Sequence, residues 1–222
     1  ISIAINKYIY IFVKKRYDKK IVLNYAKREI VSSVSEVKHQ LIKECLEMVG
    51  IKDSIEITSI ADIPSEGSGL GSSSTFTVGL LNALFEFIGK TLSQKELARL
   101  ACEIEIDICK APIGKQDQYG ASIGGLKKII FHSNDEVEIN KIPDENNLYK
   151  NLEDKLILVN SNIVRSASEI LEKQKINLSE NFERLKSFPH IVNKFEEDLS
   201  SQSFKNMYTQ LDDYWKEKKT LV

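Results

Sequence analysis

The segment Asp62–Thr75, of sequence DIPSEGSGLGSSST, combines residue types that bind phosphate. Its glycines Gly67, Gly69 and Gly71 stand at alternate positions, where the backbone can adopt positive φ angles and approach a ligand closely. Three serines and a threonine follow, and we expect them to supply hydroxyl groups and N-cap oxygens to a helix. The next residues, Phe76–Ile88, are almost wholly apolar, so this helix should be buried. A glycine-rich turn that leads into a buried helix presents backbone N–H groups to an anion, and the segment therefore predicts a phosphate-binding loop.

Two other glycine-rich motifs do not fit this segment. A Walker A loop requires Gly-Lys followed by Ser or Thr, and no lysine occurs between Pro64 and Phe87. The dinucleotide-binding fingerprint requires a glycine at the position of Ser72. A flexible serine-rich linker is the remaining alternative, but linkers are not joined directly to an apolar helix. Phosphate binding is therefore favoured.

Two acidic residues further along the chain are candidates for chemistry. Residues 92–109 are predicted to form a helix with one apolar stripe, and a capping box is expected at its start, Ser93 to Glu96. At 100° per residue, Glu105 lies on the flank of that stripe, whereas Glu103 points away from it. Taken alone, Glu105 is more typical of a surface glutamate. Asp117 lies in a segment bracketed by glycines and flanked by amide side chains that could orient it, and taken alone it could be a helix N-cap.

The pattern Pro-x-x-x-Gly-Leu-Gly-Ser-Ser resembles the second signature motif of the GHMP small-molecule kinases, which include galactokinase, homoserine kinase and mevalonate kinase. It is formed by Pro64–Ser73 with one residue inserted before Gly69. Members of this family also carry a glutamate on a helix and then an aspartate. Glu105 precedes Asp117 by 12 residues, a spacing that resembles the galactokinases. The resemblance implies that the phosphates of ATP are bound by Pro64, Glu66, Gly67, Ser68, Gly69, Leu70, Gly71, Ser72, Ser73 and Ser74.

The same resemblance implies roles for the acidic residues. The Ser73 hydroxyl and the Glu105 carboxylate would bind Mg²⁺, with Ser72 as the alternative to Ser73, since Mg²⁺ prefers oxygen ligands. Asp117 would accept or orient the proton of the acceptor hydroxyl. Two family features are not found: a cationic residue near the amino terminus that assists the aspartate, and a third, glycine-rich motif. We expect this chain to be an internal piece of a longer protein.

Three stretches resemble the bacterial D-glycero-D-manno-heptose 7-phosphate kinases of this family: Ala4–Tyr10, Gly114–Tyr119 and Ile163–Leu171. The resemblance implies phosphorylation of the anomeric hydroxyl of this sugar phosphate, for nucleotide-activated heptose and surface polysaccharide. Arg165 would then bind the phosphate of the substrate, because a guanidinium pairs with phosphate in a bidentate manner, although an arginine that merely begins a helix fits equally well. Asp117 would contact the same substrate. Alternatives are fucose, galactose or a mevalonate-like alcohol as acceptor, or a non-catalytic sugar or nucleotide sensor.

Composition narrows the functional class. The 222 residues are 42% hydrophobic and 28% charged, as in ordinary globular proteins, and the net charge of −1 gives no reason to expect nucleic-acid binding. No apolar run approaches the roughly 20 residues that a membrane span requires. The cysteines form no C-x-x-C pair, which suits a reducing compartment and predicts a cytoplasmic protein; they are Cys45, Cys102 and Cys109. The expected ligands are ATP and a sugar phosphate, and a homodimer is one possible assembly.

The elements that must position the candidate site are predicted from apolar periodicity. Two strands, 1–13 and 21–25, should form a hairpin, followed by a helix at 34–49 and a strand at 51–60 that leads into the glycine loop. After the helix at 92–109 we expect a strand at 126–131. The later elements are expected to be an edge strand and loop at 137–149, a buried strand at 156–160, a helix from Ala167, and two helices at 181–200 and 203–219.

This irregular order predicts an α+β fold and not a doubly wound sheet. The resemblance sharpens this to the two-domain GHMP kinase fold. Residues 1–153 would form the amino-terminal nucleotide-binding domain, which is similar to domain 2 of ribosomal protein S5. Residues 154–222 would form the first part of a ferredoxin-like substrate domain.

Overall fold

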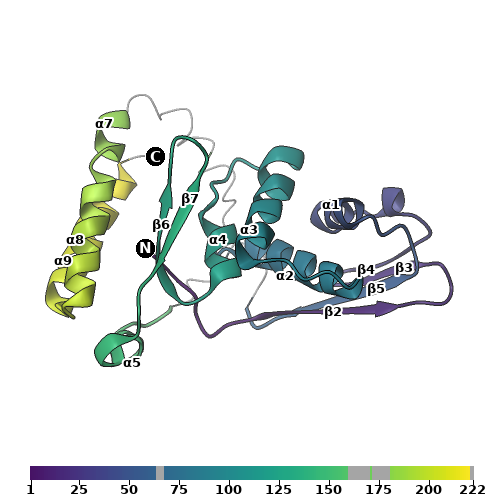
Figure 1. Cartoon of the computed structure of the whole chain (residues 1–222), viewed down its shortest axis with the longest axis horizontal. Coiled ribbons are helices and arrows are strands. Elements are labelled where there is room, and N and C mark those ends of the chain that lie inside the picture. The colour runs from purple at the N-terminus through teal and green to yellow at the C-terminus, as the bar shows by residue number, and fades with distance from the viewer. Residues whose placement is uncertain (64–67, 160–170, 172–180, 221–222) are drawn as a thin grey trace. The chain divides into compact units, whose positions relative to one another are not determined.

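The computed structural model describes residues 1–63, 68–159, 171 and 181–220, and the side chains of 183 and 184 are not described. The chain divides into two compact units (Figure 1). The N-terminal unit is Ser2–Gly125, and the C-terminal unit is Leu126–Val222 together with Ile1. The domain boundary expected after residue 153 falls inside the C-terminal unit, because residues 126–153 share an apolar core with the C-terminal helices.

The N-terminal unit is built on a four-stranded sheet of order β2-β5-β3-β4. Its strands are β2 (Ile9–Lys15), β3 (Ile21–Asn24), β4 (Arg28–Val31) and β5 (Ile55–Ala61), and a short strand, β1 (Ser2–Ile3), precedes them. The predicted hairpin of the first two long strands is wrong, because β5 lies between β2 and β3, antiparallel to the former and parallel to the latter. The actual hairpin is β3–β4, which the sequence analysis missed. Ile55 and Ile57 of β5 are buried, as a central strand requires.

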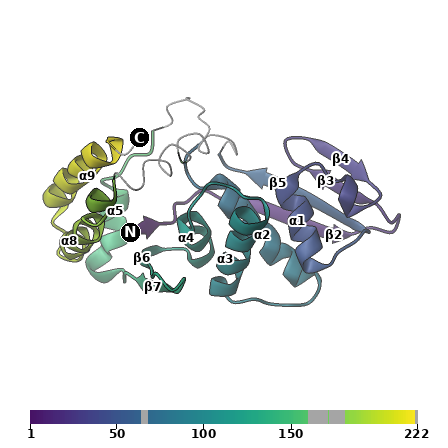
Figure 2. The same ribbon diagram turned by 90° about the horizontal axis from the view of Figure 1, so that it is seen from above.

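Helices cover one face of this sheet (Figures 1 and 2). They are α1 (Gln40–Val49), α2 (Ser72–Phe87) and α3 (Gln94–Cys102). A fourth helix, α4 (Gln116–Ile123), packs against α2 and α3. The core lies between the sheet and α2, where Leu80, Leu81 and Leu84 are fully buried. The predicted helix at 34–49 is shorter than expected: a 3₁₀ turn (Val34–Glu36) and an extended Val37 precede α1. Gly50 ends it in the left-handed conformation, for which glycine is the favoured residue.

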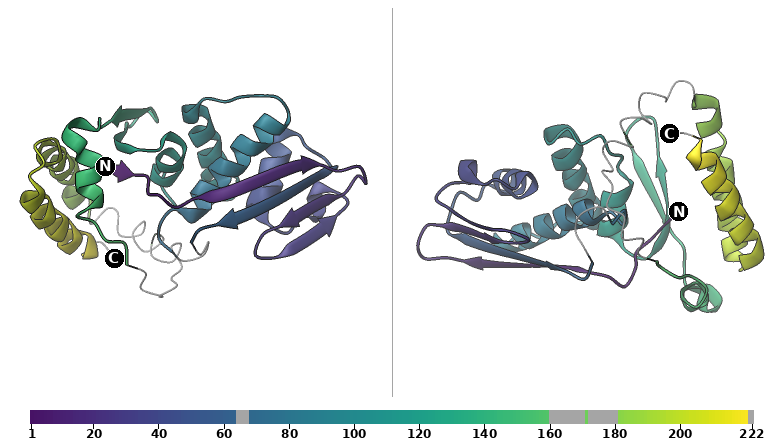
Figure 3. Two further views of the ribbon diagram at one scale, coloured as in Figure 1. Left: turned by 90° about the horizontal axis from the view of Figure 1, so that it is seen from below. Right: turned by 180° about the vertical axis from the view of Figure 1, so that it is seen from behind.

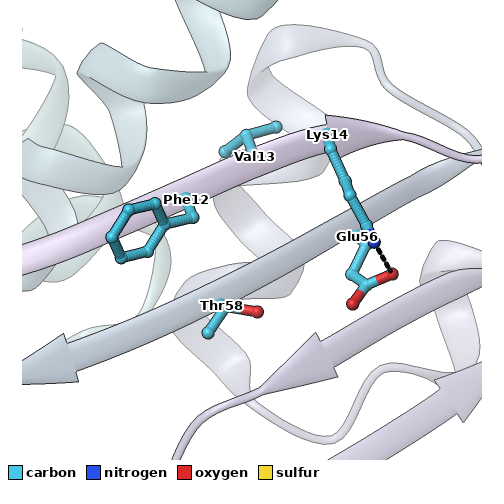
Figure 4. A pocket seen from close by; sticks show the side chains of 5 residues that line it. All are labelled: Phe12, Val13, Lys14, Glu56 and Thr58. Carbon is cyan, nitrogen blue, oxygen red and sulfur yellow. Dashed lines mark ion pairs between the residues drawn. The ribbon is translucent and has the colours of Figure 1, made fainter.

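The opposite face of the sheet has no described helix over it (Figure 3). Because side chains alternate along a strand, Tyr10 and Phe12 of β2 are on this face and exposed, as is Ile60 of β5. A pocket of about 410 Å³ on this face is lined by Phe12, Val13, Lys14, Glu56 and Thr58 (Figure 4). Lys14 and Arg16 both pair with Glu56, and Arg16 also pairs with Asp18, so two cations are balanced by two carboxylates.

The helix that carries Glu105 changes from an α-helix to a π-helix. The capping box is confirmed: Ser93 accepts from the N–H of Glu96, and the carboxylate of Glu96 accepts from that of Ser93. The α-helical part ends at Cys102, and the chain continues as a π-helix, Glu103–Ile108. A π-helix has a wider turn than an α-helix, so side chains after Cys102 do not keep the angular positions of an α-helix.

The C-terminal unit contains a hairpin of β6 (Leu126–Phe131) and β7 (Val137–Lys141). Its helices are α5 (Leu148–Glu153), after a 3₁₀ turn at Glu145–Asn147, then α7 (Phe182–Leu185), α8 (Phe188–Ser200) and α9 (Phe204–Lys219). Its core is formed by Leu126, Ile142, Leu148, Leu152, Leu199 and Met207.

Two expectations for the C-terminal unit are changed by the structure, and a third falls on residues that it does not describe. The buried strand expected at 156–160 is wrong, since Leu156–Val159 form no strand and are 49–88% exposed, and Asn160 lies outside the described residues. The helix expected at 181–200 is interrupted before Pro189, which occupies the first turn of α8. The helix expected from Ala167 also lies outside the described residues, apart from Leu171, which is helical.

Candidate functional site

The described part of the glycine loop leads directly into α2. Gly69 and Gly71 have φ angles of 69° and 70°, the left-handed region that favours glycine, and Gly71 is the N-cap residue. No described side chain caps α2, so the expectation that serines supply N-cap oxygens is wrong. The first N–H groups of an α-helix have no partner within the helix, and they are therefore suited to an anion. Pro64, Glu66 and Gly67 of the predicted loop lie outside the described residues.

The hydroxyl groups at the start of α2 are directed to Glu105. The Ser73 hydroxyl donates to Oε1 of Glu105 at 2.8 Å, and the Ser74 hydroxyl donates to Oε2 at 2.8 Å. One turn later, Thr77 donates to Oε1 at 3.1 Å. Glu105 is only 2% exposed, and a carboxylate buried so deeply requires such donors. The alternative that Glu105 is a surface glutamate is wrong, whereas Glu103 is more exposed and pairs with Arg99.

Ser74 and Thr77 were not singled out by the sequence analysis as partners of Glu105. A signal for them exists: Thr77 is a polar residue in an otherwise apolar run, three residues after Ser74 and four after Ser73, which places the three hydroxyls on one side of the helix. The same face of α2 therefore presents three hydroxyl groups to one carboxylate. Ser72, the alternative to Ser73, is instead hydrogen-bonded to the Ser68 hydroxyl at 2.8 Å.

Asp117 lies in the first turn of α4, close to the glycine loop. The N-cap of this helix is Lys115, so the alternative that Asp117 is an N-cap is wrong. A Cβ atom added to Gly71 would lie 3.0 Å from Cγ of Asp117 and 3.1 Å from its Oδ2. The absence of a side chain at Gly71 is therefore what allows the exposed carboxyl group of Asp117 to lie against the N-terminus of α2.

Gln118, the next residue, is fully buried and donates a hydrogen bond from Nε2 to Oε2 of Glu105. The two acidic residues of the predicted site are thus linked through one side chain. The flanking amides were expected to orient Asp117, and a contact of Gln118 with Glu105 was not expected, because α4 could not be oriented relative to Glu105 without coordinates.

The oxygen atoms at Glu105 fit a magnesium ion. Neighbouring ligands of an octahedral Mg²⁺, each about 2.1 Å from the ion, are about 3 Å apart. The 2.8 Å between Ser73 Oγ and Glu105 Oε1 is close to that separation, and both atoms are hard oxygen donors. Among the described residues, no three His, Cys, Asp or Glu side chains are arranged to hold a metal, so a site here would depend on the hydroxyl.

Other candidates do not contribute to this site. Arg165 lies outside the described residues. Burial raises the pKa of the Cys102 thiol to about 12 and also raises the pKa of Cys45 and Cys109, so all three are unreactive thiols. The pocket at Phe12 is on the sheet face opposite α2. Within the described ranges, none of the helices has the length and apolar character to cross a membrane.

Comparisons with known proteins agree with this geometry. Residues 30–125 match the model for the GHMP kinases N terminal domain. The chain is 30% identical, over its whole length and 69% of the relative, to a D-glycero-alpha-D-manno-heptose 7-phosphate kinase of Campylobacter jejuni. A solved D-glycero-D-manno-heptose 1-phosphate kinase from Bacteroides thetaiotaomicron superposes with a TM-score of 0.71 at 26% identity, covering 96% of this chain and 68% of that one.

A solved mevalonate kinase has a TM-score of 0.64 at 18% identity, over 96% of this chain and 71% of that one, and supports the fold alone. Together these likenesses confirm the predicted α+β fold of the GHMP kinase type. The chain spans about two thirds of the length of the heptose kinases that it matches.

Proposed function

The chain belongs to the GHMP kinases, and from this membership we propose that it transfers the γ-phosphoryl group of ATP to the anomeric hydroxyl of a sugar phosphate. The relative named for D-glycero-alpha-D-manno-heptose 7-phosphate makes that sugar the first acceptor to test. Its phosphorylation would serve the synthesis of nucleotide-activated heptose for surface polysaccharide. The observation that carries the proposal is the convergence of the Ser73–Glu105 pair and the Asp117 carboxyl on the first turn of α2.

The glycine loop and the first turn of α2 would bind the phosphates of ATP. Backbone N–H groups at a helix N-terminus favour anions through both hydrogen bonding and the helix dipole. Ser73 and Glu105 would hold Mg²⁺, which when bound neutralises negative charge on the phosphate oxygens. Because Glu105 is buried and held by three hydroxyls, we expect its carboxylate to be in place before the nucleotide binds.

Asp117 would act on the acceptor hydroxyl. Its carboxyl group is exposed and lies against Gly71, beside the N–H groups that would hold the phosphates. An acceptor hydroxyl hydrogen-bonded to Asp117 would therefore be next to the phosphoryl group that it attacks. The carboxylate orients this hydroxyl and accepts its proton as the oxygen–phosphorus bond forms and the bond to ADP breaks.

Replacement of the base tests this assignment. In Asp117→Asn we expect kcat to fall about 10²–10⁴-fold, because the amide cannot accept the proton, while the Kd of ATP stays nearly unchanged. A coupled assay of ADP release and calorimetric titration of ATP measure the two quantities on the full-length protein. Asp107→Asn is the matched control, since Asp107 is exposed and has no place in the site. Equal turnover of the two variants would remove Asp117 as the base.

The acceptor is identified by the same assay. Heptose 7-phosphate should support ADP release better than fucose, galactose or a mevalonate-like alcohol. ATP binding without turnover on any acceptor would instead favour a non-catalytic sensor of sugar or nucleotide.

A further inference from the structure

Gln118 combines two properties that are seldom found together in a buried side chain. It is 0% exposed, and its Nε2 donates to Oε2 of Glu105. Its Oε1, also buried, has no hydrogen-bond partner among the described residues. A buried carbonyl oxygen without a protein partner lowers stability, and each such group in a native protein requires an explanation, such as a bound water, an ion or a catalytic role.

Glu105 does not require Gln118 to satisfy its buried charge. Oε1 already accepts from Ser73 and Thr77, and Oε2 already accepts from Ser74. Those three donors all belong to α2, whereas Gln118 belongs to α4 and is adjacent to Asp117. The bond from Gln118 therefore adds a link between elements: it joins the π-helix that carries Glu105 to the helix turn that carries Asp117.

We propose that Gln118 is a positioning residue that holds the metal-binding carboxylate and the catalytic base at a constant separation. This inference rests on the function proposed above and extends it to a residue that is fully buried. Eleven residues, 106–116, lie between the two acids in the chain, and they include the irregular stretch between the π-helix and α4. Such a connection does not by itself fix a distance; packing of α4 on α2 and α3 sets it coarsely, and the Gln118 bond adds a direct link to Glu105.

The test compares two glutamines of the same helix. Gln118→Met keeps the length of the side chain and removes both polar groups, and Gln116→Met makes the same change at an exposed position two residues away. We expect Gln118→Met to weaken Mn²⁺ binding in the presence of ADP, measured by electron paramagnetic resonance, about tenfold, and to lower kcat by about 10–100-fold. The midpoint of urea unfolding should stay equal or rise, because the unpaired carbonyl oxygen is gone. Gln116→Met should match the wild type in all three measurements.

A second variant separates positioning from packing. Gln118→Asn keeps an amide donor on a side chain one methylene shorter, so it should retain more Mn²⁺ binding and kcat than Gln118→Met. If Gln118 only filled space, Gln118→Asn, which leaves a cavity, would be the more impaired of the two variants. Unchanged Mn²⁺ binding and kcat in Gln118→Met, or losses that merely follow unfolding, would overturn the proposal.

The same experiments distinguish this inference from the proposed function. Ser73→Ala and Asp117→Asn are measured in parallel. If neither reduces turnover, the proposed site itself is wrong and the inference falls with it. If both reduce turnover while Gln118→Met behaves like Gln116→Met, the site stands and only the positioning role of Gln118 is refuted.

Discussion

Gly71 shows how a single missing side chain determines the geometry of this site. Its φ of 70° would strain any other residue, and a Cβ atom there would meet the carboxyl group of Asp117 at 3.0–3.2 Å. Contacts below 3.4 Å force one of the two groups to move. Asp117 is exposed, so it is the group that has room to do so. The glycine is thus needed for the position of the acid as well as for the turn.

Gly71→Ala should consequently impair catalysis more than stability. We expect about 1–2 kcal/mol less stability to urea from the left-handed backbone, and a loss of kcat of about tenfold or more from displacement of Asp117. Gly89→Ala is the control, because Gly89 has a φ of 77° and no atom within 4 Å of an added Cβ. The control should show a similar loss of stability with normal kcat. Equal kcat values in the two variants would contradict the role assigned to the Gly71–Asp117 contact.

At the scale of elements, the start of α1 is determined by one histidine. Val37 is extended, and His39 takes the N-cap position, with its Nδ1 accepting from the N–H of Ile42 at 3.4 Å. The ring lies edge-on to Tyr25, with centroids 4.9 Å apart. Burial lowers the pKa of His39 below its usual 6.5, although the charge of Glu29 opposes this shift. A protonated ring could not act as the acceptor, so the cap requires neutral histidine.

The cap therefore makes stability depend on pH. Folding disfavours protonation of His39, so the contribution of its cap to the free energy of unfolding is complete above pH 6.5. That contribution is lost as the pH falls through the lowered pKa of His39 in the folded protein. His39→Asn keeps a good N-cap acceptor that does not titrate, so it should lose less stability than the wild type between about pH 6.5 and 5. Urea unfolding at several pH values measures this. His190→Asn, at an exposed position, is the control and should keep the wild-type dependence of stability on pH. If His39→Asn also kept that dependence, the cap would not contribute to it.

The π-helix is the element on which the buried acid depends. The ideal α-helical projection puts Glu105 on the flank of the apolar stripe, half in solvent, but the structure buries it against α2. The wider turn begins at Glu103, two residues before the acid, and its hydrogen bonds include that from Cys109 N–H to the carbonyl of Ile104. Such turns frequently occur at functional sites, and this one has its buried acid facing three hydroxyl groups.

At the scale of the whole molecule, the two units have separate apolar cores, so a mutation in one core should destabilise mainly its own unit. Leu199 of α8 is 1% exposed in the core of the C-terminal unit, and Leu81 of α2 is 0% exposed in the core of the N-terminal unit. A leucine-to-alanine change in either core should cost about 2–5 kcal/mol.

Amide hydrogen exchange shows which elements lose stability in each variant. In Leu199→Ala we expect faster amide exchange in α8 and α9 and little change in α2. In Leu81→Ala we expect faster exchange in α2 and little change in α8 and α9, because each leucine packs within its own core. The two variants are controls for each other. Exchange that accelerates equally throughout the chain in both would show that the units unfold as one.

Much of the site was accessible from sequence because it depends on local chemistry. Glycines at alternate positions, the apolar helix after them, the capping box at Ser93 and the left-handed Gly50 each follow from the preferences of a few neighbouring residues. The pairing of strands was not accessible. The insertion of β5 between β2 and β3 joins segments more than 30 residues apart, and alternation along a strand does not say which strand lies next to it.

The sequence by itself determined the residue types and their order: a glycine loop before a buried helix, then a glutamate and an aspartate 12 residues apart. Only the tertiary structure decided that Ser74, Thr77 and Gln118 join Ser73 at Glu105. The physical reason is rotation. A helix of known residues still has one free angle about its axis relative to each neighbour, and that angle, set by packing of the core, selects which side chains meet.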